Sequence, residues 1–122
     1  YNTYPLMDGK FVPDGLLMLS PAWLNMLENI TMVQWQHRIM ALILVKAALV
    51  FSWYTLRYHR DGASWTTWLI IIIFAQFALG IAALLSALAL PLASMHQMMA
   101  LALLAVVVRL VQASTQPAHA KS

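Results

Sequence analysis

Cysteine is absent from this chain of 122 residues, and charged residues are scarce. Without cysteine, these residues cannot build a disulfide framework, a thiolate zinc site or an iron–sulfur cluster. Only 9% of the residues are charged, against roughly 25% in an average soluble domain. The basic residues form no cluster of the kind that binds nucleic acid, so we expect no nucleic-acid partner. Histidine is left as the main candidate ligand for a transition metal.

Apolar sequence is what the chain has in excess, since 62% of its residues are hydrophobic. Three apolar runs cover residues 33–56, 65–89 and 92–113, and each is close to the roughly 20 residues that cross a bilayer. The sequence therefore predicts an all-α integral membrane fold with three transmembrane helices surrounded by membrane lipid. A polar tail, residues 114–122, follows the third run, and no separate soluble domain is expected.

Residues 1–32 precede the first apolar run and predict an extramembrane loop on the outer side of the membrane. Ser20 is expected to cap a short interfacial helix over residues 21–30, with Pro21 at its first position. The alternative interpretation is that residues 21–30 are an extended first turn of the first span.

Basic residues are concentrated at one end of the expected bundle. The segment 57–64 carries two arginines, and the C-terminal end adds Arg109 and Lys121, whereas the N-terminal segment has only Lys10. By the positive-inside rule the segment 57–64 and the tail face the cytoplasm or the mitochondrial matrix. The sequence thus predicts a bacterial or mitochondrial inner-membrane protein whose opposite, N-terminal end faces outward.

Two histidines, His37 and His96, stand near the starts of the first and third spans. Because alternate spans are parallel, both histidines should lie in the outer leaflet, roughly 6 to 8 Å below its boundary. An ionisable residue inside a membrane is a functional candidate, and two imidazoles at one depth could ligate one metal centre such as a haem iron. The alternative is that each ring only donates a hydrogen bond to a neighbouring helix. We predict that His37 and His96 are metal ligands.

Three further residues are candidates for cofactor contacts. Arg38 follows His37 at the polar boundary, where it could bind a haem propionate or simply reach toward water. Gly80 and Ala83 of the second span lie at the depth of the histidines and could leave room for a cofactor, although small residues also permit close helix packing. His59 and His119 fall in polar sequence and are assigned no role.

Several motifs along the chain together indicate a resemblance to a known family. They are Tyr1-Asn2-Thr3-Tyr4-Pro5-Leu6-Met7-Asp8-Gly9, Glu28-Asn29, Val33-Gln34-Trp35-Gln36-His37-Arg38, Leu79-Gly80-Ile81, Pro91-Leu92-Ala93 and His96-Gln97. With these motifs the chain resembles the C-terminal half of haem A synthase of the proteobacterial and mitochondrial type. It departs mildly from that family, which more often has Phe before Pro5 and at the position of Trp35.

The resemblance implies a larger protein of eight helices in two similar four-helix halves. That protein would oxidise a methyl group of haem O to the formyl group of haem A for cytochrome oxidase. This chain would contribute the last three helices, most of the C-terminal half-bundle, in which His37 and His96 match the pair that binds haem b. The partners implied are haem O as substrate, the missing N-terminal half, haem O synthase and oxidase assembly factors. The substrate half would also hold an important glutamate, for which Glu28 is no substitute.

Two other functions remain open at the level of sequence. One is a bis-histidine b-haem anchor or electron-transfer subunit of a respiratory complex, and the other is a purely structural cluster of spans. The chain begins at Tyr1 without an initiator methionine, so we expect it to be the C-terminal piece of a longer protein. A haem spectrum would separate the structural cluster from the others, and the sequence upstream of Tyr1 would separate the enzyme from the anchor.

Overall fold

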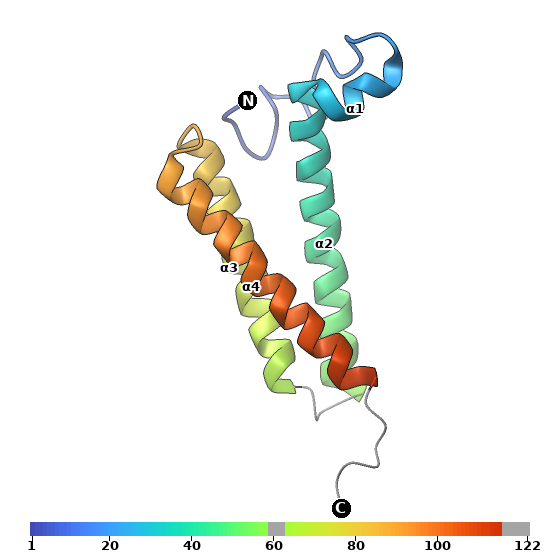
Figure 1. Ribbon diagram of the computed structural model, residues 1–122, viewed down its shortest axis with the longest axis vertical. Coiled ribbons are helices and arrows are strands. Elements are labelled where there is room, and N and C mark those ends of the chain that lie inside the picture. Colours follow the sequence, from blue (N-terminus) through green and yellow to red (C-terminus); the bar gives the residue numbers. More distant parts are fainter. Residues whose placement is uncertain (59–62, 116–122) are drawn as a thin grey trace, which may run out of the picture.

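The computed structural model describes residues 1–58 and 63–115, and within these ranges the regular structure is helical (Figure 1). Its elements are the 3-10 helix η1 (Ala22–Leu24) and the α-helices α1 (Asn25–Glu28), α2 (Ile30–Tyr58), α3 (Ala63–Leu85) and α4 (Leu90–Thr115). The last three are long and apolar enough to cross a membrane. The expected all-α fold with three candidate spans is confirmed.

The turn between the second and third spans lies earlier than the sequence indicated. We expected the second span to run to residue 89, but α3 ends at Leu85. Ala87 and Leu88 adopt the left-handed conformation, with φ of 54° and 62°, which a helix cannot continue through. The backbone N–H of Leu88 then donates to the carbonyl of Ala83 at 2.8 Å and satisfies one of the last carbonyls of α3.

The short interfacial helix is broken into two pieces. Residues 22–24 form η1 and residues 25–28 form α1, and the capping residue of η1 is Pro21, so the expected Ser20 cap was wrong. Asn29 has an extended backbone, with φ of −80° and ψ of 108°, and it separates α1 from α2. Its Oδ1 accepts hydrogen bonds from the N–H groups of Thr31 and Met32, at 3.0 and 3.4 Å, and so caps the first span.

Two asparagines fix the outer loop onto the start of α2. Asn25 is completely buried, and its amide bonds both the N–H and the carbonyl of Leu19, at 2.9 and 2.8 Å. The Nδ2 of Asn29 donates to the carbonyl of Gly15 at 2.7 Å and to Oδ1 of Asn25 at 3.0 Å. The loop therefore folds over the N-terminal end of α2 (Figure 1), because side-chain amides replace the backbone pairing that a loop lacks.

The three spans alternate in direction, and α3 packs against both α2 and α4. The apolar side chains that meet at these contacts are Leu69 and Ile73 of α3, Leu103 and Leu110 of α4, and Val45 and Ala48 of α2. Only 11%, 17% and 6% of the three apolar windows are buried inside the structure. The spans thus leave most of their apolar surface to lipid or to other helices, and they do not close a complete core among themselves.

We predict that Asn29 has two separable roles in a full-length protein. Asn29→Ala should remove both the cap of α2 and the bonds to the loop, with a loss of about 1 to 2 kcal/mol and faster proteolysis near residues 15–19. Asn29→Asp keeps the capping oxygen and loses only the donor, so proteolysis should accelerate with a smaller loss of thermal stability. Equal effects of the two variants in a thermal scan would contradict this division.

Candidate functional site

The structure brings His37 of α2 and His96 of α4 into contact. Their ring centroids are 6.3 Å apart, and the ring planes make an angle of 67°. Both helices run in the same direction, and at 1.5 Å per residue both histidines lie about 10 Å from the start of their helix. His96 is partly buried, whereas His37 is exposed on one side of the pair. The rings therefore meet at one depth, and His37 is the more exposed of the two.

The separation of the two rings fits a shared haem iron. If one nitrogen of each ring is turned toward the other, an iron–nitrogen bond of about 2 Å on each side, plus about 1 Å from each nitrogen to its ring centre, would place the centroids about 6 Å apart. Axial ligands can rotate about the iron–nitrogen axis, so an angle of 67° between the planes is compatible with ligation. In residues 1–58 and 63–115 no group of three or more His, Cys, Asp and Glu could hold a metal ion. A porphyrin needs only two protein ligands, because it supplies the other four.

Gly80 is the point at which α3 accommodates His96. A Cβ atom at residue 80 would lie 2.9 Å from Cε1 of His96 and 3.4 Å from its Nδ1. The space that the sequence indicated at Gly80 is thus used by the imidazole itself. Ala83 is 4% exposed and belongs to the packed end of α3. Direct contact of Gly80 or Ala83 with a cofactor stays a prediction.

Gln76 is the polar neighbour of His96, and the sequence analysis gave it no role. Its Nε2 lies 3.4 Å from Nε2 of His96. Nδ1 of His96 and Oε1 of Gln76 are both buried without a hydrogen-bond partner. With the amide turned by 180°, Oε1 of Gln76 would accept a hydrogen bond from Nε2–H of His96, which leaves Nδ1 of His96 as the buried atom without a partner among the protein atoms. The sequence feature that could have indicated a role for Gln76 is its amide, which stands alone in an apolar run one helical turn before Gly80.

Arg38 holds the N-terminal segment. Its guanidinium donates to the carbonyls of Pro5, Leu6 and Tyr1, each at 3.3 Å. Carbonyl groups do not neutralise the positive charge, and the Nε of Arg38 is buried without a partner. The expected contact with a haem propionate stays a prediction, for which this remaining N–H is the available donor.

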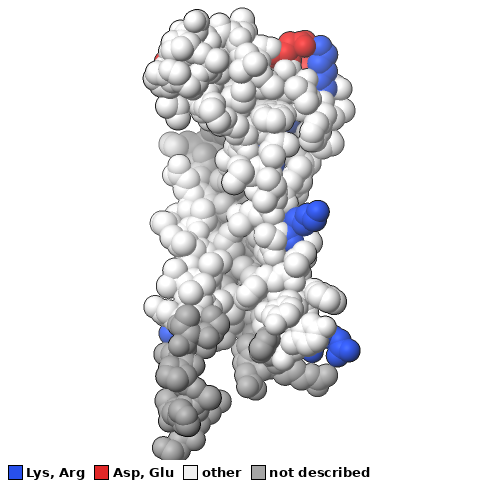
Figure 2. Space-filling model, turned by 90° about the vertical axis from the view of Figure 1, so that its right-hand side faces the viewer, with Lys and Arg blue, Asp and Glu red and all other residues white. Residues whose placement is uncertain are grey.

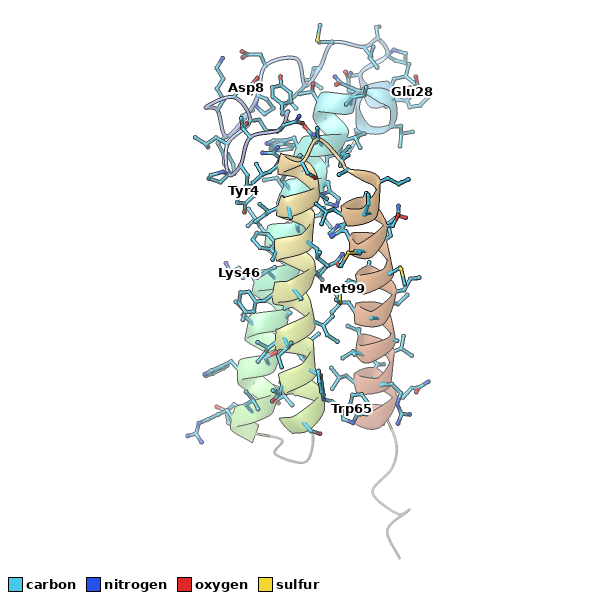
Figure 3. All side chains as sticks on the ribbon, turned by 90° about the vertical axis from the view of Figure 1, so that its left-hand side faces the viewer. Tyr4, Asp8, Glu28, Lys46, Trp65 and Met99 are labelled. Atoms are coloured by element: carbon cyan, nitrogen blue, oxygen red, sulfur yellow. The ribbon has the colours of Figure 1, made fainter. Side chains whose placement is uncertain are left out.

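The N-terminal segment bridges two spans above the histidines. Trp35 donates its indole N–H to the carbonyl of Phe11 at 3.0 Å, which adds a second tie to α2. The ring of Tyr4 meets Phe77 of α3 edge-on, at 6.1 Å between centroids, and Figure 3 shows Tyr4 beside the upper part of that helix. This segment covers the outer end of the site. His59 and His119, to which no role was assigned, lie outside the described residues.

Comparison with known proteins identifies the family. A model of the family COX15-CtaA, described as cytochrome oxidase assembly protein, matches residues 1–108. The chain belongs to this family. The family includes oxidoreductases, since the relatives described next are named heme A synthase. The match to the family model includes both histidines and the N-terminal segment.

Relatives named heme A synthase match most of the chain. The protein of Bartonella henselae is 42% identical over 106 residues, which are 85% of this chain and 30% of the relative. That of Parvibaculum lavamentivorans is 40% identical over 97 residues, 80% of this chain and 28% of the relative. That of Nitrosospira multiformis is 40% identical over 105 residues, which are 84% of this chain and 30% of the relative. The chain thus spans about 30% of the length of these relatives. No solved structure matches it.

Gly80→Ala should displace the His96 ring in a full-length protein, because the added methyl group would stand 2.9 Å from Cε1. We expect a loss of about 1 to 3 kcal/mol, as in other overpacked sites, seen as a lower thermal midpoint. Ala78→Val adds bulk at an exposed position of the same helix and is the control. Since Ala is also favoured over Gly in a helix by about 1 kcal/mol, a Gly80→Ala variant that gains this full amount in stability would show that the close approach of His96 to α3 is wrong.

Proposed function

We propose that this chain is the C-terminal, haem b-binding portion of haem A synthase, in which His37 and His96 are the two axial ligands. The observation that supports this proposal most directly is the 6.3 Å separation of the two ring centroids at one depth. The family match and the relatives named heme A synthase support the assignment of the enzyme.

The roles of the residues follow from this arrangement. When bound, haem b supplies one-electron redox chemistry through its iron. His37 and His96 would hold the haem iron between two imidazoles, which would suit electron transfer rather than the binding of oxygen or substrate. Gly80 allows His96 to lie against α3, and Gln76, whose amide is 3.4 Å from Nε2 of His96, would have to release that nitrogen if it is the one that binds the iron. Arg38 is the donor for a propionate at the outer end. Oxidation of the methyl group of haem O to the formyl of haem A then belongs to the rest of the enzyme, with its N-terminal half.

The proposed setting is a bacterial or mitochondrial inner membrane, with the histidine pair toward the outer side. Arg57 lies in the last turn of α2, and Arg109 lies near the end of α4, where its guanidinium is 5.8 Å from the ring centre of Trp65. These cations lie at the end opposite to the histidines, which by the positive-inside rule faces the cytoplasm or matrix. The proposed partners are haem O, haem O synthase and oxidase assembly factors.

The anchor subunit of a respiratory complex is the less favoured assignment, because the matching relatives are heme A synthases. A purely structural role for the spans leaves the buried, unpaired Nδ1 of His96 without an account. Both alternatives also leave the match over residues 1–108 to one enzyme family unexplained.

His37→Ala or His96→Ala should remove the low-spin b-type absorption spectrum of a purified full-length protein, because either change removes one axial ligand. His59→Ala and His119→Ala are matched controls and should leave the spectrum intact. The measurement is the reduced-minus-oxidised difference spectrum with haem content per protein. A double variant of His37 and His96 that still binds low-spin haem would end the assignment.

Arg38→Leu should weaken haem retention without abolishing it, because it removes the donor expected at a propionate and frees residues 1–6. Arg38→Lys keeps the charge but cannot reproduce the planar set of donors that binds three carbonyls. We therefore expect an intermediate haem content for Arg38→Lys, measured together with the redox potential. Unchanged haem content and potential in Arg38→Leu would restrict Arg38 to holding the N-terminal segment.

A further inference from the structure

Lys46 is a cation in the middle of the first span. It is exposed, and it has no hydrogen bond or ion pair with any residue of the described ranges 1–58 and 63–115. Nine residues separate it from His37, which turns it to the opposite face of α2 and away from the histidine pair. Figure 3 shows Lys46 about midway along the helix, and in Figure 2 the surface around mid-height is otherwise almost free of charge.

The depth of Lys46 can be read from the two tryptophans of α2. Trp35 and Trp53 are about 27 Å apart along the helix, close to the roughly 30 Å of a hydrocarbon core. Lys46 lies about 10 Å from the level of Trp53, whereas a lysine side chain extends about 6 Å. Helical side chains also lean toward the N-terminus, which directs Lys46 away from this nearer boundary. The ammonium group therefore remains in the hydrocarbon region.

An ammonium group at this depth requires an anionic partner, since unpaired charges inside a membrane are rare. The chain has four acidic residues: Asp8, Asp14 and Glu28 precede the first span, and Asp61 lies in the sequence between the first and second spans. None is within a span. A second copy of these residues therefore cannot bring a carboxylate to the level of Lys46.

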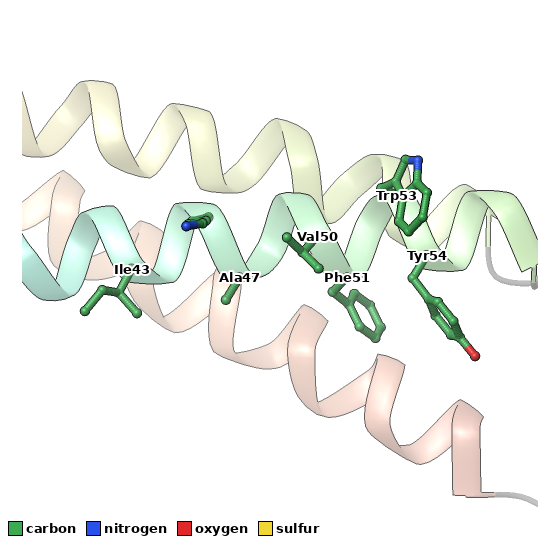
Figure 4. Close-up of a pocket in the computed structure, with 7 residues that line it drawn as sticks. Ile43, Ala47, Val50, Phe51, Trp53 and Tyr54 are labelled. Carbon is green, nitrogen blue, oxygen red and sulfur yellow. The ribbon is translucent and has the colours of Figure 1, made fainter.

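The surface around Lys46 is suited to a helix. Figure 4 shows Ile43, Ala47, Val50 and Phe51 along one side of α2. The first, third and fourth of these are 54%, 58% and 45% exposed, and the small Ala47 beside Lys46 allows close approach of another backbone. A shallow depression lies along this side of α2, and we define the Lys46 face by the residues that line it: Ile43, Lys46, Ala47, Val50, Phe51, Trp53 and Tyr54.

We propose that the Lys46 face docks a membrane-spanning helix that carries an aspartate or glutamate at mid-depth, and that this helix belongs to the part of the full-length protein outside these 122 residues. The chain spans about 30% of the length of its relatives, so most of such a protein remains to supply it. The proposal rests on the proposed function only in taking the chain as part of a longer protein.

The sign of the stability change of Lys46→Met tests the proposal in a full-length protein. A paired lysine leaves a buried carboxylate unpaired when it is removed, so the thermal midpoint should fall by about 5 °C or more. A lysine that faces lipid would instead be replaced by a side chain the hydrocarbon prefers. An unchanged or higher midpoint for Lys46→Met would therefore overturn the proposal. Leu104→Met at an exposed position of α4 is the control and should leave the midpoint unchanged.

A photo-crosslinking amino acid at residue 46 identifies the partner directly. Mass spectrometry should find the crosslink in an apolar segment outside these 122 residues that contains an acidic residue. A crosslink to lipid alone, to residues 1–122 of a second copy, to a different protein, or to a segment without an acid would overturn the proposal. Replacement of the identified acid by its amide should then lower the midpoint as Lys46→Met does.

The haem spectrum keeps this test separate from that of the proposed function. Lys46 is turned away from His37, so Lys46→Met should retain the low-spin spectrum wherever the wild type has one. Absence of haem from the wild type would refute the proposed function and leave the stability and crosslinking results on the docking helix as they stand.

Discussion

The contact between the His96 ring and α3 at Gly80 determines the geometry of the site. A methyl group at residue 80 would stand 2.9 Å from Cε1 of His96, so no other residue type allows this approach without a shift of the ring. Because the ring lies against α3, it reaches His37 of α2 at 6.3 Å between centroids. A displacement of His96 would therefore be transmitted directly to the pair. The absence of a side chain at residue 80 is what permits the His96 ring to lie this close to α3.

A second set of contacts holds the outer end of the same site. Asn29 caps α2 and at the same time bonds the carbonyl of Gly15, so the start of the span and the loop above it are fixed by one side chain. Arg38 and Trp35 then bind carbonyls of the N-terminal segment. His37 lies between these two residues in sequence, and its backbone position is consequently restrained from both sides. The loop thus contributes to the placement of His37, which it does not touch in any of the contacts described.

The spans and the meeting of the histidines could be predicted from sequence because both follow from simple periodic geometry. Apolar runs identify the spans, and parallel helices bring His37 and His96 to one depth. The end of α3 could not be predicted, because Ala87 and Leu88 are left-handed residues in a run that remains apolar to residue 89. The carbonyl partners of Arg38 depend on a loop conformation that has no period. The contact of Gln76 with His96 depends on how α3 and α4 are rotated against each other, so it also required the three-dimensional structure.

The incompleteness of the bundle and the exposure of His37 have a common physical basis. The three helices bury only 6 to 17% of their apolar windows, and the side of the histidine pair at His37 stays exposed. A porphyrin between His37 and His96 would bring a large apolar edge to that open side, and its burial would be favourable only against further apolar surface. Lys46 lies on the opposite face of α2, and its ammonium group requires an anionic partner. The face of the first span at His37 thus requires apolar covering, and the face at Lys46 requires a carboxylate. Lipid acyl chains supply the apolar covering but not the carboxylate.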